Sequence, residues 1–131
     1  MQKQRKKRWK QQNQHNMDIS VITPSVREDG LELVFRCLKK QTFPRDRWEW
    51  IVGSDFEYPQ ADVWVKDPGK KEEDFYSLNA TYNAMLRVAK GELIISYQDG
   101  IWTSPDMLEH FWNLYQENPH ACFSGVGDQY S

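Results

Sequence analysis

Short apolar segments with strand character alternate with helix-spaced ones along the chain, and this alternation restricts the fold more than any other feature. Residues 18–24 carry β-branched side chains and end at a proline, which predicts a buried strand followed by a turn. An apolar stripe at i, i+3, i+4 and i+7 comes next and predicts an amphipathic helix. This stripe consists of Leu31, Val34, Phe35 and Leu38. Further strands are predicted at residues 48–52, 63–65, 92–97 and 121–126, and further helices at residues 78–89 and 104–117.

Strands that alternate with helices favour an α/β fold with a mainly parallel sheet that helices cover on both faces. Right-handed crossovers are expected between the parallel strands. In such sheets, ligands bind beyond the carboxyl ends of the strands. The polar residues that follow the predicted strands are therefore candidates for function. They are Thr23, Ser25, Arg27, Ser54, Asp55, Gln98 and Asp99.

Local signals predict where the later helices begin and end. Gly91 stands where a C-cap belongs after the second predicted helix. Ser104 and Pro105 form a favourable N-cap and N1 pair for the last helix. Asn118 followed by Pro119 is expected to end that helix.

The charge of the chain is unevenly distributed. Six basic residues fall within residues 1–16, and the first acidic residue is Asp18. The rest of the chain has 11 basic and 19 acidic residues, a formal charge of −8. We predict a disordered basic leader at residues 1–16 and a folded acidic unit at residues 17–131. The leader either attracts nucleic acid or an anionic membrane surface, or it has no role, with Met17 as the natural start. We favour the second interpretation and expect no nucleic-acid partner.

Apolar runs in this sequence are short, whereas a membrane helix needs about 20 consecutive apolar residues. No apolar core of a signal peptide follows the N-terminus. We therefore expect a soluble, cytoplasmic protein without a transmembrane segment. Cys37 and Cys122 stand among apolar residues, form no CxxC motif and are expected to be buried free thiols. The three histidines lack the spacing of a zinc site.

The first predicted strand is not followed by a glycine-rich phosphate loop of either common type, GxGxxG or GxxxxGK[ST]. This argues against a dinucleotide oxidoreductase and against a nucleoside-triphosphatase. If a phosphorylated ligand binds, another group must balance its charge. In an acidic domain, a divalent cation between carboxylate and phosphate is a suitable candidate.

Four segments, in this order, resemble family 2 glycosyltransferases of the GT-A type. Residues 19–27 are similar to the opening strand of the family and its Pro-Thr-Tyr-Asn-Arg turn, and residues 36–44 resemble its Ser-Leu-x-x-Gln-Thr-Tyr-Pro pattern. Residues 48–55 resemble the strand that ends in paired aspartates. Residues 79–92 resemble the Arg-Asn-x-(Gly)…Gly-Glu segment, which leads into the metal-binding strand end at residues 97–101.

The resemblance implies a Rossmann-like GT-A fold for nucleotide-diphospho-sugar transfer, of which residues 17–131 would be the N-terminal, donor-binding part. Thr23 and Pro24 would contact the base of the nucleotide through their backbone, and Arg27 would lie near the nucleotide. Asp55 would bind the base or ribose, Asn83 would shape the donor pocket, and Asp99 would hold Mn²⁺ or Mg²⁺ on the diphosphate. Ser25 and Trp102 complete the expected contacts; Trp102 follows a strand end and can stack on a sugar or base, whereas Trp112 lies in the apolar stripe of its helix and is expected in the core.

The sequence departs from the family pattern at two places. The Asp-x-Asp motif reads Gln98-Asp99-Gly100, so one carboxylate stands where two or three are usual, and Ser54 replaces the first of the paired aspartates. The catalytic base of the family lies in the acceptor half, and no residue here is assigned to it. We therefore expect a fragment of a longer protein or a chain that needs a partner. If the chain ends at Ser131, exposed apolar surface would favour a homo-oligomer.

The expected activity is transfer of a sugar, with inversion, from a UDP- or GDP-sugar to an unknown acceptor. A metal-independent or non-catalytic nucleotide-binding or assembly module is the alternative. A nucleotidyltransferase is a third reading, although residues 23–30 are not its glycine-rich basic loop. Simpler structural readings also stay open: Asp99-Gly100 as a plain turn, Asp55 as a loop residue, Arg27 as part of a solvated helix entry and Asn83 as a solvated helix residue.

Overall fold

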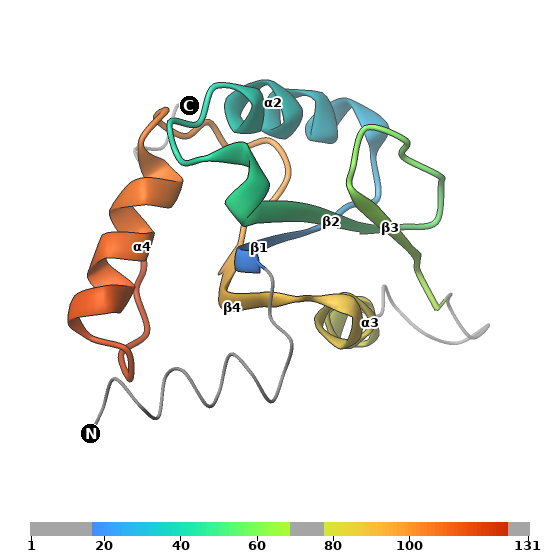
Figure 1. The fold of residues 1–131 in the computed structure, drawn as a ribbon. Helices are drawn as coiled ribbons and strands as arrows, with labels where there is room; N and C mark the ends of the chain where they lie inside the picture. The colour runs from blue at the N-terminus through green and yellow to red at the C-terminus, as the bar shows by residue number, and fades with distance from the viewer. Residues whose placement is uncertain (1–16, 69–77, 126–131) are drawn as a thin grey trace.

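The computed structural model describes residues 17–68 and 78–125, so the predicted leader lies outside the described residues. The described chain is an α/β unit in which strands and helices alternate (Figure 1). The elements in chain order are β1 (Met17–Pro24), α2 (Glu28–Lys39), the 3₁₀ turn η1 (Arg45–Arg47), β2 (Trp48–Ser54), β3 (Val63–Lys66), α3 (Leu78–Val88), β4 (Gly91–Ser96) and α4 (Met107–Glu117).

The four strands form one parallel sheet with the order β3-β2-β1-β4, which confirms the predicted sheet type. β1 is central and pairs with β2 on one side and with β4 on the other. The register places Val21 of β1 opposite Trp50 of β2 and Ile95 of β4. Because all four strands run in the same direction, their carboxyl ends meet at one edge of the sheet.

Alternate residues of β1, β2 and β3 contribute to two different apolar clusters, as the period of two in a strand requires. Val21 of β1 packs with Leu31 and Val34 of α2 and with the aromatic side chains of α4. Ile22, its neighbour in β1, packs instead with Met85 of α3. Helices therefore cover both faces of the sheet, as predicted (Figure 1).

Two glycines allow close approaches between elements. A Cβ atom on Gly53 of β2 would lie 2.7 Å from Thr81 Cγ2, so this glycine lets α3 approach the sheet. A Cβ atom on Gly91 would lie 2.2 Å from the backbone nitrogen of Ser20. The predicted C-cap role of Gly91 is wrong, because α3 already ends at Val88 and Gly91 begins β4 against the backbone of β1.

A buried polar network connects the beginning of β4 to β1 and β2. Glu49 Oε2 accepts hydrogen bonds from Ser20 Oγ at 2.6 Å and from the backbone N–H of Lys90 at 2.7 Å. Ser20 Oγ in turn accepts the backbone N–H of Gly91 at 2.7 Å. Glu49 is 4% exposed, so these donors compensate much of the cost of burying a carboxylate.

Two other predictions are wrong. α4 begins at Met107 rather than after Ser104, because Ser104 Oγ donates to Asp106 Oδ1 and the Ser104 carbonyl accepts the N–H of Met107 in a turn. Residues 121–125 form no strand; they follow a turn in which the Ala121 N–H donates to the Asn118 carbonyl, and Val126 lies outside the described residues. α4 does end at Glu117, before Asn118, as expected.

The two thiols differ in their surroundings. Cys37 is buried in the core, as expected, whereas Cys122 is exposed, which corrects the prediction that both would be buried. Trp112 is 9% exposed and packs in the core, as predicted.

Among the residues that the structure describes, no helix is long and apolar enough to cross a membrane.

Candidate functional site

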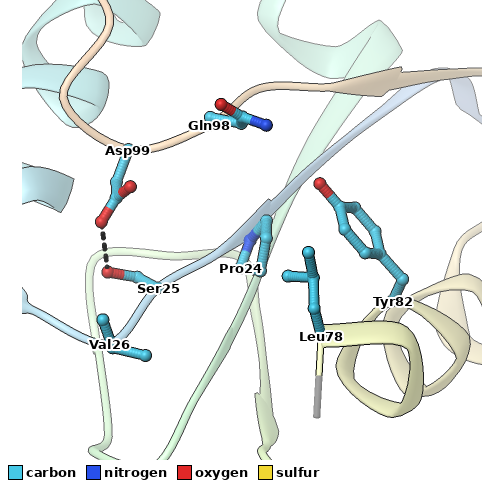
Figure 2. A pocket seen from close by; sticks show the side chains of 7 residues that line it. All are labelled: Pro24, Ser25, Val26, Leu78, Tyr82, Gln98 and Asp99. Carbon is cyan, nitrogen blue, oxygen red and sulfur yellow. Dashed lines mark hydrogen bonds between the residues drawn. The ribbon is translucent and has the colours of Figure 1, made fainter. Parts of the chain in front are cut away.

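An open pocket of about 140 Å³ lies at the carboxyl ends of β1 and β4, beside the first turns of α3 (Figure 2). This is the edge at which parallel sheets of this kind bind ligands. The turn after β1 and the loop after β4 line part of the pocket, and α3 forms its side wall. The lining residues are Pro24, Ser25, Val26, Leu78, Tyr82, Gln98 and Asp99.

Ser25 orients the carboxylate of Asp99 across the pocket, as the dashed line in Figure 2 shows. Its Oγ lies 3.0 Å from Asp99 Oδ2 and 2.7 Å from the carbonyl oxygen of Arg27, and it accepts the backbone N–H of Arg27 at 3.1 Å. The single hydroxyl proton is therefore shared between the Asp99 carboxylate and the Arg27 carbonyl. Ser25 itself is fixed because its N–H donates to the Gly53 carbonyl at 2.9 Å.

Asp99 lies against the first turn of α2 at Gly30. A Cβ atom on Gly30 would lie 2.8 Å from Asp99 Oδ2, so only a glycine leaves room for this carboxylate. The next residue, Gly100, has a φ of 75°, and its N–H donates to the Gly30 carbonyl at 3.1 Å. Asp99-Gly100 is therefore a glycine-dependent turn and, at the same time, places its aspartate in the pocket.

Tyr97 and Gln41 hold the two ends of the loop that carries Asp99. The Tyr97 hydroxyl donates to the Ile101 carbonyl at 2.5 Å and accepts from Thr103 Oγ1 at 3.1 Å. Gln41 Nε2 donates to the Ser104 carbonyl at 2.8 Å. Burial is the main cause that raises the pKa of Tyr97 above its usual value of 10.0, so its hydroxyl stays protonated into the alkaline range.

The wall opposite the polar residues is largely apolar. Val26 and Leu78 are 58% and 41% exposed, which is high for large aliphatic side chains. Tyr82 lies beside Leu78 (Figure 2), and its hydroxyl is 3.0 Å from Ser96 Oγ at the end of β4. A pocket with an apolar wall and a few oriented polar groups suits a small organic ligand that also carries polar groups.

The structure brings four of the residues predicted for function together: Pro24, Ser25, Gln98 and Asp99 all line the pocket. The side chain of Thr23 is buried, and its Oγ1 accepts a hydrogen bond from Trp50 Nε1 at 3.0 Å. Thr23 can therefore reach a ligand only through its backbone. The remaining predicted residues are exposed and outside the pocket lining; they are Arg27, Asp55, Asn83 and Trp102.

Ser54 stands at the position where the resemblance expects the first of two aspartates. It is fully buried, accepts a hydrogen bond from Trp64 Nε1 at 3.0 Å and donates to the Phe56 carbonyl at 2.5 Å. Ser54 therefore closes the loop that follows β2. Asp55, the next residue, is exposed on this loop.

The oxygen donors at the pocket suit Mg²⁺ or Mn²⁺ in kind but are few in number. In residues 17–68 and 78–125, no group of three or more His, Cys, Asp or Glu side chains is placed to hold a metal ion. Asp99 supplies one carboxylate, and one of its oxygens already faces Ser25. A hard cation fits here only if phosphate oxygens and water supply most of its ligands.

Sequence reasoning missed several residues that shape the site. Tyr82 falls within the helix predicted at residues 78–89, and only the packing of α3 shows that it lines the pocket. Tyr97 and Gln41 were read as parts of wider motifs, without roles of their own.

Known structures are similar to this chain, although no family model and no curated protein matches the sequence. The structure of S. aureus TarS, a glycosyltransferase, has a TM-score of 0.60 at 20% identity, over 77% of this chain and 20% of TarS. S. aureus TarS 1-349 in complex with UDP-GlcNAc has a TM-score of 0.61 at 20% identity, over 79% of this chain and 32% of that one. The complex of TarS 1-349 with UDP has a TM-score of 0.59 at 20% identity, over 79% and 33%.

This likeness establishes the fold alone: the described unit has the Rossmann-like α/β fold of a GT-A-type glycosyltransferase. The chain spans only about a fifth to a third of the length of these proteins. Membership of family 2 stays a prediction.

Proposed function

We propose that this chain binds a nucleotide-diphospho-sugar and is the donor-binding part of a glycosyltransferase. The observation that carries the proposal is the pocket at the carboxyl ends of β1 and β4, where Ser25 orients the carboxylate of Asp99. The fold around this pocket is similar to that of TarS 1-349, whose structures contain UDP and UDP-GlcNAc. A uridine nucleotide is therefore the first donor to test, and a guanosine nucleotide the second.

In the proposed complex, the apolar wall of Val26, Leu78 and Tyr82 packs against the nucleoside, and Ser25 and Asp99 contact its polar groups. Arg27 is exposed, directly follows the pocket residue Val26, and is the proposed contact for a phosphate. Asp55, Asn83 and Trp102 stay proposed contacts for the ribose, the donor pocket and the sugar. A divalent cation on Asp99 would supply positive charge to the leaving diphosphate.

The proposed reaction is attack of an acceptor hydroxyl on the anomeric carbon, with inversion and release of the nucleoside diphosphate. The new bond joins the acceptor oxygen to the anomeric carbon, and the bond to the diphosphate oxygen breaks. None of the described residues is assigned as the base that takes the proton of the acceptor hydroxyl. The acceptor half of the reaction therefore belongs to other chain segments or to a partner.

Calorimetry of the 131-residue chain with UDP, UDP-GlcNAc and GDP, each with and without Mn²⁺, tests the proposal. We expect one of these nucleotides to bind, and Asp99→Ala to weaken binding about tenfold and to remove the response to Mn²⁺. Asp46→Ala is the matched control, because Asp46 is exposed in η1 at the opposite edge of the sheet. Absence of binding by every nucleotide contradicts the donor site, and an unchanged metal response in Asp99→Ala contradicts the role of Asp99.

A non-catalytic nucleotide-binding module is the second candidate. It is favoured by Gln98 and Gly100, which flank Asp99 where the resemblance expects further carboxylates. Release of UDP from UDP-GlcNAc separates the two candidates in a chain that binds the donor. Turnover above the rate of Asp99→Ala supports the enzyme, whereas tight binding without turnover, in the presence of the chain segments or the partner that supply the acceptor half, supports the module.

A further inference from the structure

The loop from residue 98 to residue 106 carries two residues of the proposed donor site, Asp99 and Trp102, and it has no regular secondary structure. Its far end is fixed by the side chain of Gln41, which donates to the Ser104 carbonyl and accepts the N–H of Leu108 at 3.0 Å. The Thr42 N–H adds a bond to the Pro105 carbonyl at 2.8 Å. The part that faces the ligand, residues 98–103, needs an anchor of its own.

Tyr97 provides this anchor from inside the core. The residue is 4% exposed, belongs to the apolar cluster between the sheet and α2, and donates its backbone N–H to the Ile22 carbonyl at 2.9 Å. Its hydroxyl extends to the loop, where it binds the Ile101 carbonyl and the Thr103 hydroxyl. These two hydrogen bonds connect Tyr97 to residues 101 and 103 and so close a short loop that contains Gln98, Asp99 and Gly100.

The anchored loop holds large apolar side chains in solvent. Trp102 is 64% exposed and Ile101 is 46% exposed, so this loop presents apolar side chains to solvent. Ordering a flexible loop at the moment of binding reduces affinity, because only the fraction of molecules in the competent arrangement can bind. A loop that is already hydrogen-bonded to a rigid core residue does not lose this affinity, because it is ordered before the ligand binds.

We propose that Tyr97 is a positioning residue, whose buried hydroxyl holds residues 98–103 in the arrangement that presents Asp99 and Trp102 to the donor. The proposal rests on the proposed function for its ligand and on the two hydroxyl bonds for its mechanism. Tyr97 touches neither the donor nor the reacting atoms; it acts through the loop.

Tyr97→Phe tests the proposal, since it removes the hydroxyl and keeps the buried ring. We expect UDP-GlcNAc, measured by calorimetry on the full chain, to bind about tenfold more weakly. Hydrogen–deuterium exchange in the peptide over residues 98–104 should become faster, while exchange in β1 stays unchanged. Thr103→Val removes one of the two bonds and should change both readouts in the same direction but less, which keeps the test decisive if Tyr97→Phe folds poorly.

Tyr115→Phe is the matched control. Tyr115 is partly buried on α4, and its hydroxyl donates to Glu92 Oε1 at 3.0 Å, at the opposite end of β4 from the pocket. This variant loses a comparable hydrogen bond, so it should lose stability without a change in donor affinity beyond about twofold.

Two results would overturn the proposal: unchanged affinity and loop exchange in Tyr97→Phe, or an equal loss of affinity in Tyr115→Phe, which would indicate a general effect of stability. If the wild-type chain binds no nucleotide, the proposed function fails, and the exchange rates of residues 98–104 still decide whether Tyr97 holds the loop.

Discussion

At the scale of single residues, Asp99 is fixed from several directions at once. Ser25 faces its Oδ2, Gly30 leaves the space that the carboxylate fills, and the Gly100 N–H binds the α2 backbone immediately after it. The carboxylate therefore has a defined orientation before any ligand arrives. This pre-organisation is what a single acidic residue needs if it is to replace a larger acidic motif.

Gly30→Ala tests this orientation directly. The new Cβ would lie 2.8 Å from Asp99 Oδ2, so the carboxylate must move, and we expect the affinity for UDP-GlcNAc to fall by at least about threefold. Overall stability should change by less than about 1 kcal/mol, because the higher helix propensity of alanine offsets the displacement. Calorimetry and urea unfolding measure the two effects.

The control uses the same substitution in an Asp99→Gly background. With the side chain at position 99 removed, Gly30→Ala should stabilise the chain by up to about 1 kcal/mol. If the substitution has equal effects in both backgrounds, Gly30 and Asp99 are not coupled in the way the structure implies.

The meeting of Pro24, Ser25 and Asp99 was predictable, because the carboxyl ends of parallel strands share one edge and polar residues follow each predicted strand there. The anchoring of their loop was not predictable. The bonds of Tyr97 join a core side chain to backbone atoms several residues later, and no periodicity or motif encodes such a contact.

At the scale of elements, the junction of α3 and β4 depends on close packing against β1. Gly91 touches the backbone of Ser20, and Glu49 binds donors from Ser20 and Lys90 around it. The prediction of a C-cap at Gly91 failed because local sequence shows that a glycine follows a helix but not which strand will lie beside it.

Gly91→Ala should destabilise the fold by about 3 kcal/mol, since its Cβ would lie 2.2 Å from a backbone nitrogen that cannot move alone. Urea unfolding followed by circular dichroism measures this loss. Gly125→Ala is the control, because its Cβ would meet only Phe111 Cζ at an ordinary 3.8 Å. Similar stabilities of the two variants would contradict the packing described for β4.

Glu49→Ala should cost about 2–3 kcal/mol, because Ser20 Oγ and the Lys90 N–H lose their buried acceptor. Glu32→Ala is its counterpart on the surface, where the pair with Arg36 is more than 60% exposed, and should cost no more than about 0.5 kcal/mol. The same unfolding experiment compares them. Equal losses would show that the buried network adds nothing beyond a surface ion pair.

At the scale of the whole molecule, the buried tyrosines connect stability to alkaline pH. Burial, followed by the hydrogen bond to Glu92, raises the pKa of Tyr115 to about 12, and burial raises the pKa of Tyr97 and Tyr58 above 10.0. The folded state thus keeps protons that the unfolded chain releases near pH 10. The contribution to stability is complete below pH 10 and is lost as the pH rises toward 12.

Urea unfolding midpoints between pH 8 and pH 11.5 measure this dependence. The midpoint of the wild-type chain should fall above about pH 10, and that of Tyr115→Phe should fall less steeply because one raised pKa is absent. Parallel slopes for the two chains would contradict the raised pKa of Tyr115.

The fold class followed from the alternation of strands and helices, which local patterns encode well. Residues 121–125 were predicted to form a strand from local pattern alone, and they form none. A segment with a high β-propensity forms a strand only where the fold brings it beside the open edge of another strand, and residues 121–125 pair with no strand of the described sheet.

The central claim is that the pocket between β1, β4 and α3 binds a nucleotide-diphospho-sugar. Titration of the ¹⁵N-labelled chain with UDP-GlcNAc, followed through its amide resonances, tests it most directly. We predict shifts at Ser25, Val26 and Asp99 and unchanged resonances in η1 at the opposite edge of the sheet. Saturating ligand that shifts no pocket resonance, or shifts only those of η1, would contradict the account.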